Sequence, residues 1–271
     1  MFRVVFLFLF FFLISLQGEI LQEKIKNIIG ERNYLIHKGL IGHLFKNEPR
    51  YFNGDRIRYF NLFKTLQENG LLDLRLQKRG NIQLKFKISN NQQKGYKILN
   101  DTLETLGYKY FFTTVFENNV EYILWDISFS AEYNVDPVIF IRELKQNGVQ
   151  VMNVTKIDEK SWSYELDFHN AYLERSVKID TNEKVYFRKL LKPLVLNVPE
   201  IKSVEVRSHN LNRWYPKVVF FDKNLKVLKS IEYAKYQKRI KVSAPLGTKY
   251  VKVTDLYNLI NIKRGLTIIV R

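Results

Sequence analysis

The chain has 271 residues, no cysteine and a formal net charge of +17, from 44 Lys and Arg against 27 Asp and Glu. The absence of cysteine excludes disulfide bonds, thiolate metal ligands and cysteine nucleophiles. The length is sufficient for two hydrophobic cores of ordinary size.

The first residues have the pattern of a secretory signal peptide. Arg3 precedes an apolar run of 13 residues, Val4 to Leu16. A membrane-spanning helix needs about 20 such residues, whereas the apolar core of a signal peptide needs about 7–15. We therefore predict a signal peptide over residues 1–18, cleaved after Gly18, and a periplasmic protein. Leu16 fits the small-residue rule for cleavage poorly, so an uncleaved anchor in the inner membrane is the alternative.

The positive charge is concentrated at the C-terminal end of the chain. Residues 171–271 hold 22 Lys and Arg against 8 Asp and Glu, whereas residues 80–170 hold 9 against 12. This asymmetry indicates a basic module with an anionic partner. For an exported protein, that partner is an envelope polymer, a membrane surface or an acidic protein rather than nucleic acid. The alternative is a compositional excess of Lys from an AT-rich genome, without a role in binding.

Residues 19–71 are predicted to form a helical N-terminal region. Ile25, Ile28 and Ile29 recur near helical spacing before Gly30. A second helix is predicted over residues 54–70, with Asp55 as its N-cap and Gly70 at its C-terminal end. Its apolar stripe comprises Ile57, Phe60, Phe63 and Leu66.

Residues 72–170 alternate between strand and helix patterns in the order β-α-β-β-α-β, followed by one extra strand. Strands are predicted over residues 82–89, 108–116, 120–129, 149–157 and 161–168, and helices over residues 92–107 and 136–148. Asp136 and Pro137 mark the start of the second helix. This order resembles the ferredoxin-like split βαβ arrangement, in which two helices cover one face of an antiparallel sheet. The resemblance implies a fold and no function, because this architecture serves many activities.

Residues 171–271 show only short strand patterns, separated by turns. This spacing predicts a basic β-sandwich or jelly roll, so the fold class of the whole chain is α+β. Alternation in the predicted strands places basic side chains on outward faces. The nine predicted strands cover residues 175–180, 184–190, 194–198, 202–208, 217–222, 225–231, 239–244, 248–255 and 266–270.

One stretch of this basic region, residues 208–224, is the candidate binding site. Val218 to Phe221 are apolar on both faces, which predicts a central strand with Pro216 at its start. Trp214 then lies at a sheet end, where it is either a platform for an anionic sugar or a plug of the core. The candidate ligand-binding residues are Arg207, His209, Arg213, Trp214, Tyr215 and Lys217.

Patterns for catalysis or metal binding are weak. His37 and His43 are six residues apart, which misses the i, i+4 spacing of a helical metal pair. Asp126 and Asp167 lie in or beside strands, as the paired carboxylates of a hydrolase do, but such acids are usually solvated. We predict no enzyme, no metal and no cofactor.

Two functional hypotheses follow. The first is a non-catalytic structural or assembly protein of the Gram-negative cell envelope, acting through protein–protein contacts in an envelope complex. The alternative is a module that binds glycan or cell wall through the basic C-terminal domain. A hydrolase is a distant third.

Overall fold

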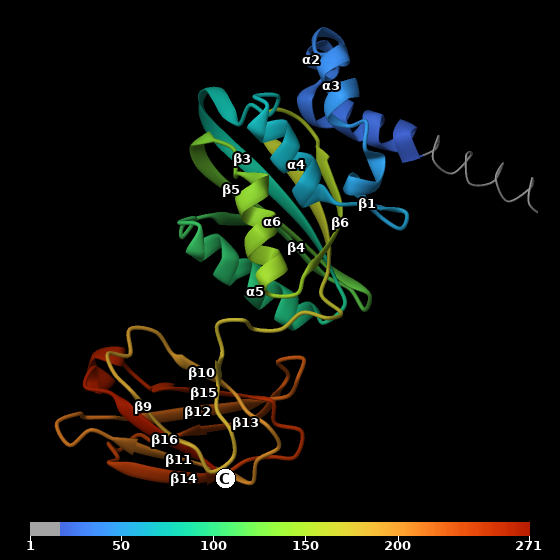
Figure 1. The fold of residues 1–271 in the computed structure, drawn as a ribbon. Helices are drawn as coiled ribbons and strands as arrows, with labels where there is room; N and C mark the ends of the chain where they lie inside the picture. Colours follow the sequence, from blue (N-terminus) through green and yellow to red (C-terminus); the bar gives the residue numbers. More distant parts are fainter. Residues whose placement is uncertain (1–16) are drawn as a thin grey trace, which may run out of the picture. The chain divides into compact units, whose positions relative to one another are not determined.

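The computed structural model describes residues 17–271, which form two compact units that divide between Tyr172 and Leu173 (Figure 1). The predicted signal peptide falls almost entirely on residues 1–16, which lie outside the described residues. Within the described part of the chain, no helix is long and apolar enough to cross a membrane. Helices and several β-sheets are both present, as an α+β protein requires.

The N-terminal unit begins with short helices. Residues 17–29 are helical and bury Ile25, Ile28 and Ile29, and Gly30 interrupts the helix with φ +83°. Helices α2 (Glu31–Ile36) and α3 (Lys38–Leu44) follow, and then the 3₁₀ helix η1 (Glu48–Tyr51). The predicted helical region therefore exists, and it belongs to the same unit as the α/β elements that follow it.

The helix predicted over residues 54–70 begins later than expected. Arg56 and Ile57 form strand β2 (Arg56–Ile57), which pairs with β1 (Phe52–Asn53). Because these residues are extended, helix α4 (Tyr59–Glu68) starts only at Tyr59, and Asp55 does not cap it. Gly70 follows the helix with φ +68°, as predicted.

The main sheet of the N-terminal unit has five strands in the order β4-β5-β3-β7-β6. Strand β5 pairs antiparallel with both β4 and β3 and so separates these two strands. The extra strand β7 lies inside the sheet, parallel to β3 and between β3 and β6. The strands and helices are β3 (Arg75–Ser89), α5 (Gln92–Thr105), β4 (Phe112–Asn118), β5 (Tyr122–Tyr133), α6 (Pro137–Gln146), β6 (Gln150–Lys156) and β7 (Ser161–Asp167).

Helices α4, α5 and α6 cover one face of this sheet (Figure 1). Helix α6 starts where it was predicted, because the Asp136 carboxylate accepts hydrogen bonds from the backbone N–H of Val138 (2.8 Å) and of Ile139 (3.2 Å). Under the helices lies an aromatic core in which the rings of Trp125, Phe140 and Tyr164 surround Phe86. The buried apolar side chains of β3 are Leu76, Ile82, Leu84, Phe86 and Ile88.

The C-terminal unit consists of two sheets with one hydrophobic core between them. The five-stranded sheet has the order β13-β12-β15-β10-β8, and the four-stranded sheet has the order β14-β11-β16-β9 (Figure 1). Val204 and Ile268 reach the core from the four-stranded sheet, and Phe220 and Val251 reach it from the other. The strands are β8 (Val177–Lys178), β9 (Lys184–Phe187), β10 (Leu194–Asn197), β11 (Ser203–Ser208), β12 (Pro216–Phe221), β13 (Val227–Glu232), β14 (Arg239–Ser243), β15 (Tyr250–Asp255) and β16 (Leu266–Val270).

Each of the nine predicted strands of this unit overlaps one observed strand. Strand β12 begins at Pro216 and lies between β13 and β15, as its apolar residues predicted. The boundary between the units lies two residues later than the sequence suggested. Ala171 belongs to the N-terminal unit, where its carbonyl accepts a hydrogen bond from the buried Lys94 ammonium at 2.9 Å.

We predict that a fragment of residues 173–271 folds by itself, because its sheets enclose their own core. It should unfold in urea as one cooperative transition, followed by circular dichroism. The matched control is the complementary fragment of residues 19–172. A fragment 173–271 that unfolds gradually, while the full chain unfolds cooperatively, would show that the two units share stabilising contacts.

Candidate functional site

The strand connections of the C-terminal unit gather at its two ends. Ser208 at the end of β11 lies opposite Leu266 at the start of β16, and Pro216 at the start of β12 lies opposite Asp255 at the end of β15. The connections that leave these strands therefore meet at one end, which we call the loop end; it carries the 3₁₀ helix η2 (Leu259–Ile262) (Figure 1). The loop end comprises residues 188–193, 209–215, 233–238 and 256–265.

Charge is distributed unequally between the two ends. The four connections at the loop end contain eight Lys and Arg residues and neither Asp nor Glu, and the Asp255 carboxylate that lies against them is buried. The connections at the opposite end, residues 179–183, 198–202, 222–226 and 244–249, contain four Lys and four Asp or Glu. The eight cations of the loop end are Arg188, Lys189, Lys192, Arg213, Lys235, Lys238, Lys263 and Arg264.

These cations are exposed, and most have no neutralising neighbour. No ion pair to a carboxylate is formed, within residues 17–271, by Arg188, Lys189, Arg213, Lys235, Lys263 or Arg264. Because these six cations are exposed and are not in ion pairs within residues 17–271, this end of the unit attracts anions over about a Debye length, roughly 8 Å at physiological ionic strength.

Large apolar side chains are exposed among the cations. Leu191 is 83% exposed, Leu211 69% and Ile260 65%, and Tyr236 and Tyr257 are also exposed. Neither these residues nor the flanking cations outside residues 208–224 were among the candidate residues predicted from the sequence. They come from four separate connections, and only the fold brings them together. The signal present in the sequence was the absence of Asp and Glu from alternate connections between strands.

Asn212 holds two of these connections together. Its buried side-chain N–H groups donate to the carbonyl of Gly265 (2.9 Å) and to the hydroxyl of Ser208 (3.2 Å), and its Oδ1 accepts from the backbone N–H of Arg264 (3.2 Å). The Lys238 ammonium donates to the Asn212 carbonyl at 2.7 Å and so links a third connection, residues 233–238, to residues 209–215. Because these polar groups are satisfied, the loop end has a fixed arrangement.

Asp255 organises the segment around η2 from beneath. Its buried carboxylate accepts backbone N–H groups of Tyr215 (2.8 Å), Tyr257 (2.9 Å) and Asn258 (2.9 Å). The side chain of Asn261 donates to the same carboxylate at 3.0 Å. This carboxylate is used within the fold and is not available to an external ligand.

Trp214 lies in the core. Its side chain is fully buried, and its Nε1–H donates to the Thr254 carbonyl at 3.0 Å. No face of the indole is open to a sugar, so Trp214 has the contacts of a core plug rather than those of a binding platform.

Three of the other candidate residues lie at the loop end. Arg213 is exposed, with its guanidinium 5.9 Å from the centre of the Tyr215 ring. Tyr215 is half-buried against the edge of the Tyr257 ring. His209 is exposed, and its Nδ1 accepts the backbone N–H of Leu211 at 3.2 Å.

The remaining two candidates lie on strands and have carboxylate partners. Lys217 on β12 pairs with Glu232 directly across on β13 at 2.7 Å. Arg207 on β11 donates through Nε to Glu205 at 2.7 Å. The structure therefore does not bring the six predicted residues together into one site.

Glu205 is the unexpected residue on the outward face of the four-stranded sheet. It alternates with the core residues Val204 and Val206 and so faces outward, but three arginines cover its side chain completely. Arg239 donates to the same oxygen as Arg207 at 2.7 Å, and Arg271 lies 3.3 Å from the other oxygen. These hydrogen bonds, led by that from Arg207, hold the pKa of Glu205 below its ordinary value against the effect of burial. One carboxylate cannot neutralise three guanidinium groups, so this face remains cationic.

Asp126 and Asp167 in the N-terminal unit do not form a carboxylate pair. Asp126 is opposite Lys85, and Asp167 is opposite Ser89, four residues further along β3. At about 3.3 Å per residue they are roughly 13 Å apart along the strands, whereas hydrolytic pairs are separated by about 5–9.5 Å. Burial raises the pKa of Asp126, and Lys85, at 3.7 Å, opposes that shift.

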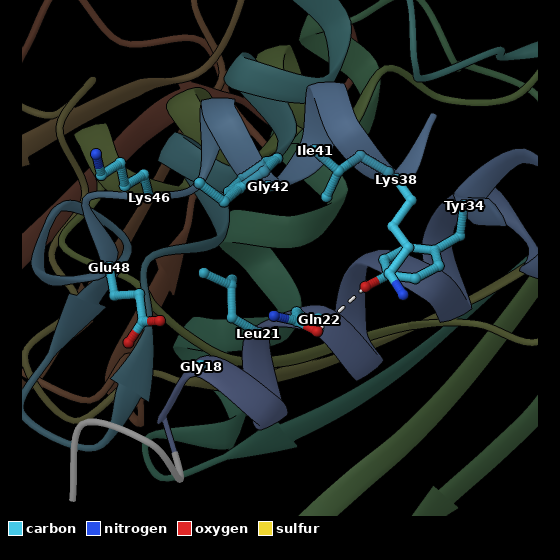
Figure 2. A pocket seen from close by; sticks show the side chains of 10 residues that line it. Gly18, Leu21, Gln22, Tyr34, Lys38, Ile41, Gly42, Lys46 and Glu48 are labelled. Atoms are coloured by element: carbon cyan, nitrogen blue, oxygen red, sulfur yellow. Dashed lines mark hydrogen bonds between the residues drawn. The ribbon is translucent and has the colours of Figure 1, made fainter. Parts of the chain in front are cut away.

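A small cavity in the N-terminal unit, about 160 Å³, lies between the first helical residues and α3. Figure 2 shows its wall, with Leu21 and Ile41 facing each other and the Tyr34 hydroxyl donating to Gln22 at 3.2 Å. Glu48 is the single acid among its lining residues, and none of them is a His, Ser or Thr. The lining therefore supplies no base beside a hydroxyl nucleophile. Nowhere in residues 17–271 do three His, Asp or Glu side chains come together as metal ligands.

Comparison with known proteins adds little to this geometry. No family model matches the sequence, and no curated protein matches it. Among solved structures, a β-glucosidase from Paenibacillus barengoltzii is similar at 15% identity, over 34% of this chain and 11% of that chain, with a TM-score of 0.17. A similarity this weak supports no inference about the present chain.

The burial of Trp214 predicts a large loss of stability on truncation. Trp214→Ala should lower the free energy of unfolding of the C-terminal unit by about 3–5 kcal/mol, as aromatic truncations in cores do. Urea unfolding followed by circular dichroism measures this. Fluorescence of Trp125 and Trp162, both in the N-terminal unit, should be unaffected and is the control. A loss below about 1 kcal/mol would contradict the core contacts described for Trp214.

The arginine contacts of Glu205 predict a specific pH dependence. Because folding lowers its pKa from 4.5, Glu205 stabilises the folded state fully above about pH 4.5, and this contribution is lost as the pH falls through the folded-state pKa. Glu205→Gln should therefore destabilise the C-terminal unit at pH 7 and weaken its response to acid below pH 4.5. Thermal unfolding between pH 7 and pH 3 measures both effects, with Glu232→Gln as the exposed control. Parallel pH profiles for the Glu205 variant and the unmodified chain would refute this account.

Proposed function

We propose that this chain is a non-catalytic, exported protein of the cell envelope, which acts by binding an anionic envelope component through the loop end of its C-terminal unit. The observation that carries the proposal is the segregation of charge: the connections at the loop end contain eight cations and no acid, whereas those at the other end have balanced charge. A compositional excess of Lys would raise the positive charge at both ends. The unequal distribution therefore favours a role in binding.

In this proposal the N-terminal unit contacts another protein of the envelope. The sheet face opposite its helices is polar, with Lys85 and Lys87 near Asp126 and Glu165. A surface that carries both charges can form complementary charge contacts that orient a protein partner within an envelope assembly. In terms of fold, we propose a ferredoxin-like variant with one inserted strand, followed by a jelly-roll-like sandwich. Export depends on the predicted signal peptide over residues 1–18.

The proposal predicts that binding depends on the loop end and on salt. The triple variant Lys235→Glu, Lys263→Glu, Arg264→Glu should bind envelope fragments of a Gram-negative host more than about tenfold more weakly, because each cation near an anionic surface contributes about 1 kcal/mol. Co-sedimentation at low and high ionic strength measures binding.

The matched control reverses three lysines at the opposite end, Lys202→Glu, Lys223→Glu, Lys226→Glu. This variant has the same net charge as the loop-end variant, so net charge alone cannot explain a difference between them. Equal loss of binding in both variants would mean that total charge matters and the loop end does not. Circular dichroism of both variants shows whether they are folded.

A further inference from the structure

We propose that the anionic component is a lipid bilayer, and that the loop end inserts the side chains of Leu191, Leu211 and Ile260 among anionic lipid headgroups. This inference rests on the proposed function and names its ligand class. It follows from the exposed apolar side chains rather than from charge, because any polyanion attracts the cations.

The apolar side chains separate a bilayer from a soluble polymer. A hydrated polyanion provides no apolar phase, so Leu and Ile side chains that project toward it would stay in water. A bilayer provides the acyl boundary beneath its headgroups, and proteins that lie on membranes combine basic residues with large apolar ones for this reason. Of the eight large apolar side chains exposed in residues 173–271, five are at the loop end: Leu191, Leu211, Tyr236, Tyr257 and Ile260.

The arrangement of the loop end places these side chains on neighbouring segments. The backbone N–H of Arg213 donates to the Asn261 carbonyl at 3.2 Å, which sets the segment containing Leu211 beside that containing Ile260. The Tyr186 hydroxyl donates to the Arg264 carbonyl at 2.6 Å and links the end of β9, from which the Leu191 connection departs, to the same region. The segments that carry Leu211 and Ile260 are therefore adjacent, and the connection that carries Leu191 leaves its strand at the same end of the unit, as do the unpaired cations.

The tyrosines, lysines and arginines of the loop end also have the chemistry of a membrane-binding surface. Tyr236 and Tyr257 are exposed beside the cations, and tyrosine is favoured at the level of lipid headgroups because its ring is apolar and its hydroxyl is polar. Lys and Arg reach phosphate groups while their methylene stems remain in apolar surroundings. The absence of Asp and Glu from the loop end removes repulsion from anionic lipids.

Two sets of variants test the inference, in a chain that starts at Glu19, because the apolar run of residues 4–16 would itself bind any bilayer. The tip variant is Leu191→Ser, Leu211→Ser, Ile260→Ser, and its control is Leu246→Ser, which removes a 90% exposed leucine from the opposite end. Binding is measured to vesicles of phosphatidylcholine with phosphatidylglycerol, to vesicles of phosphatidylcholine alone, and to heparin as a soluble polyanion.

We expect the tip variant to bind the phosphatidylglycerol vesicles at least about tenfold more weakly than the unmodified chain, because three apolar side chains lose their burial. Its binding to heparin should be unchanged, and the Leu246 control should match the unmodified chain throughout. Phosphatidylcholine vesicles should bind weakly, since they carry no net charge.

The contrary results are distinguishable. In one contrary result, the tip variant binds vesicles as well as the unmodified chain does, whereas the variant with Lys235, Lys263 and Arg264 changed to Glu loses binding to both vesicles and heparin. The proposed insertion would then be wrong, and the ligand would be a soluble anionic polymer instead of a bilayer. If the charge variant also binds normally, the proposed function itself fails.

A direct measurement of insertion uses the absence of cysteine from the chain. Leu211→Cys and Leu246→Cys can each be labelled with one environment-sensitive fluorophore. On phosphatidylglycerol vesicles, the emission of the label at residue 211 should shift to the blue, and that at residue 246 should not. The absence of a shift at residue 211 in bound protein would overturn the inference.

Discussion

The buried indole of Trp214 is the contact on which the loop end depends. In the extended segment around it, the tryptophan points into the core of the C-terminal unit, and its neighbours Arg213 and Tyr215 point away from that core. The Thr254 carbonyl accepts the indole N–H, and the adjacent Asp255 carboxylate accepts the backbone N–H of Tyr215. The residues that hold the connections in place are thus buried. The side chains that the connections expose to solvent are cationic or apolar.

Carboxylates in the C-terminal unit have two different roles. Asp255 and Glu205 are buried and are both engaged within the fold, the first by backbone N–H groups and the Asn261 side chain and the second by arginines. Neither cancels the charge that the loop end presents to solvent. The remaining exposed acids in the connections are at the opposite end, so the unit has a cationic end and a neutral end. A surface of this kind orients the protein when it meets an anionic partner.

Local patterns in the sequence predicted most of the helices and strands, but not their long-range pairing. The strands of the C-terminal unit were predictable because alternation and turn residues are local signals, and Asp136 and Pro137 marked the start of α6 for the same reason. The parallel pairing of β7 with β3 joins residues about eighty positions apart, and no local signal encodes it. The pairing of Arg56 and Ile57 in β2 likewise overrode their helical pattern. The candidate site was found in part: Arg213 and Tyr215 lie at the loop end, but the other connections reach it only through the fold.

The most direct test of the account is to map which lysines the envelope surface protects. Acetylation of the chain from Glu19 onward, with and without bound envelope membranes, can be quantified for each lysine by mass spectrometry. The account predicts protection of Lys189, Lys235 and Lys263 at the loop end, and unchanged acetylation of Lys202, Lys223 and Lys226 at the opposite end. Protection of the second group, or of neither group, in membrane-bound protein would contradict it.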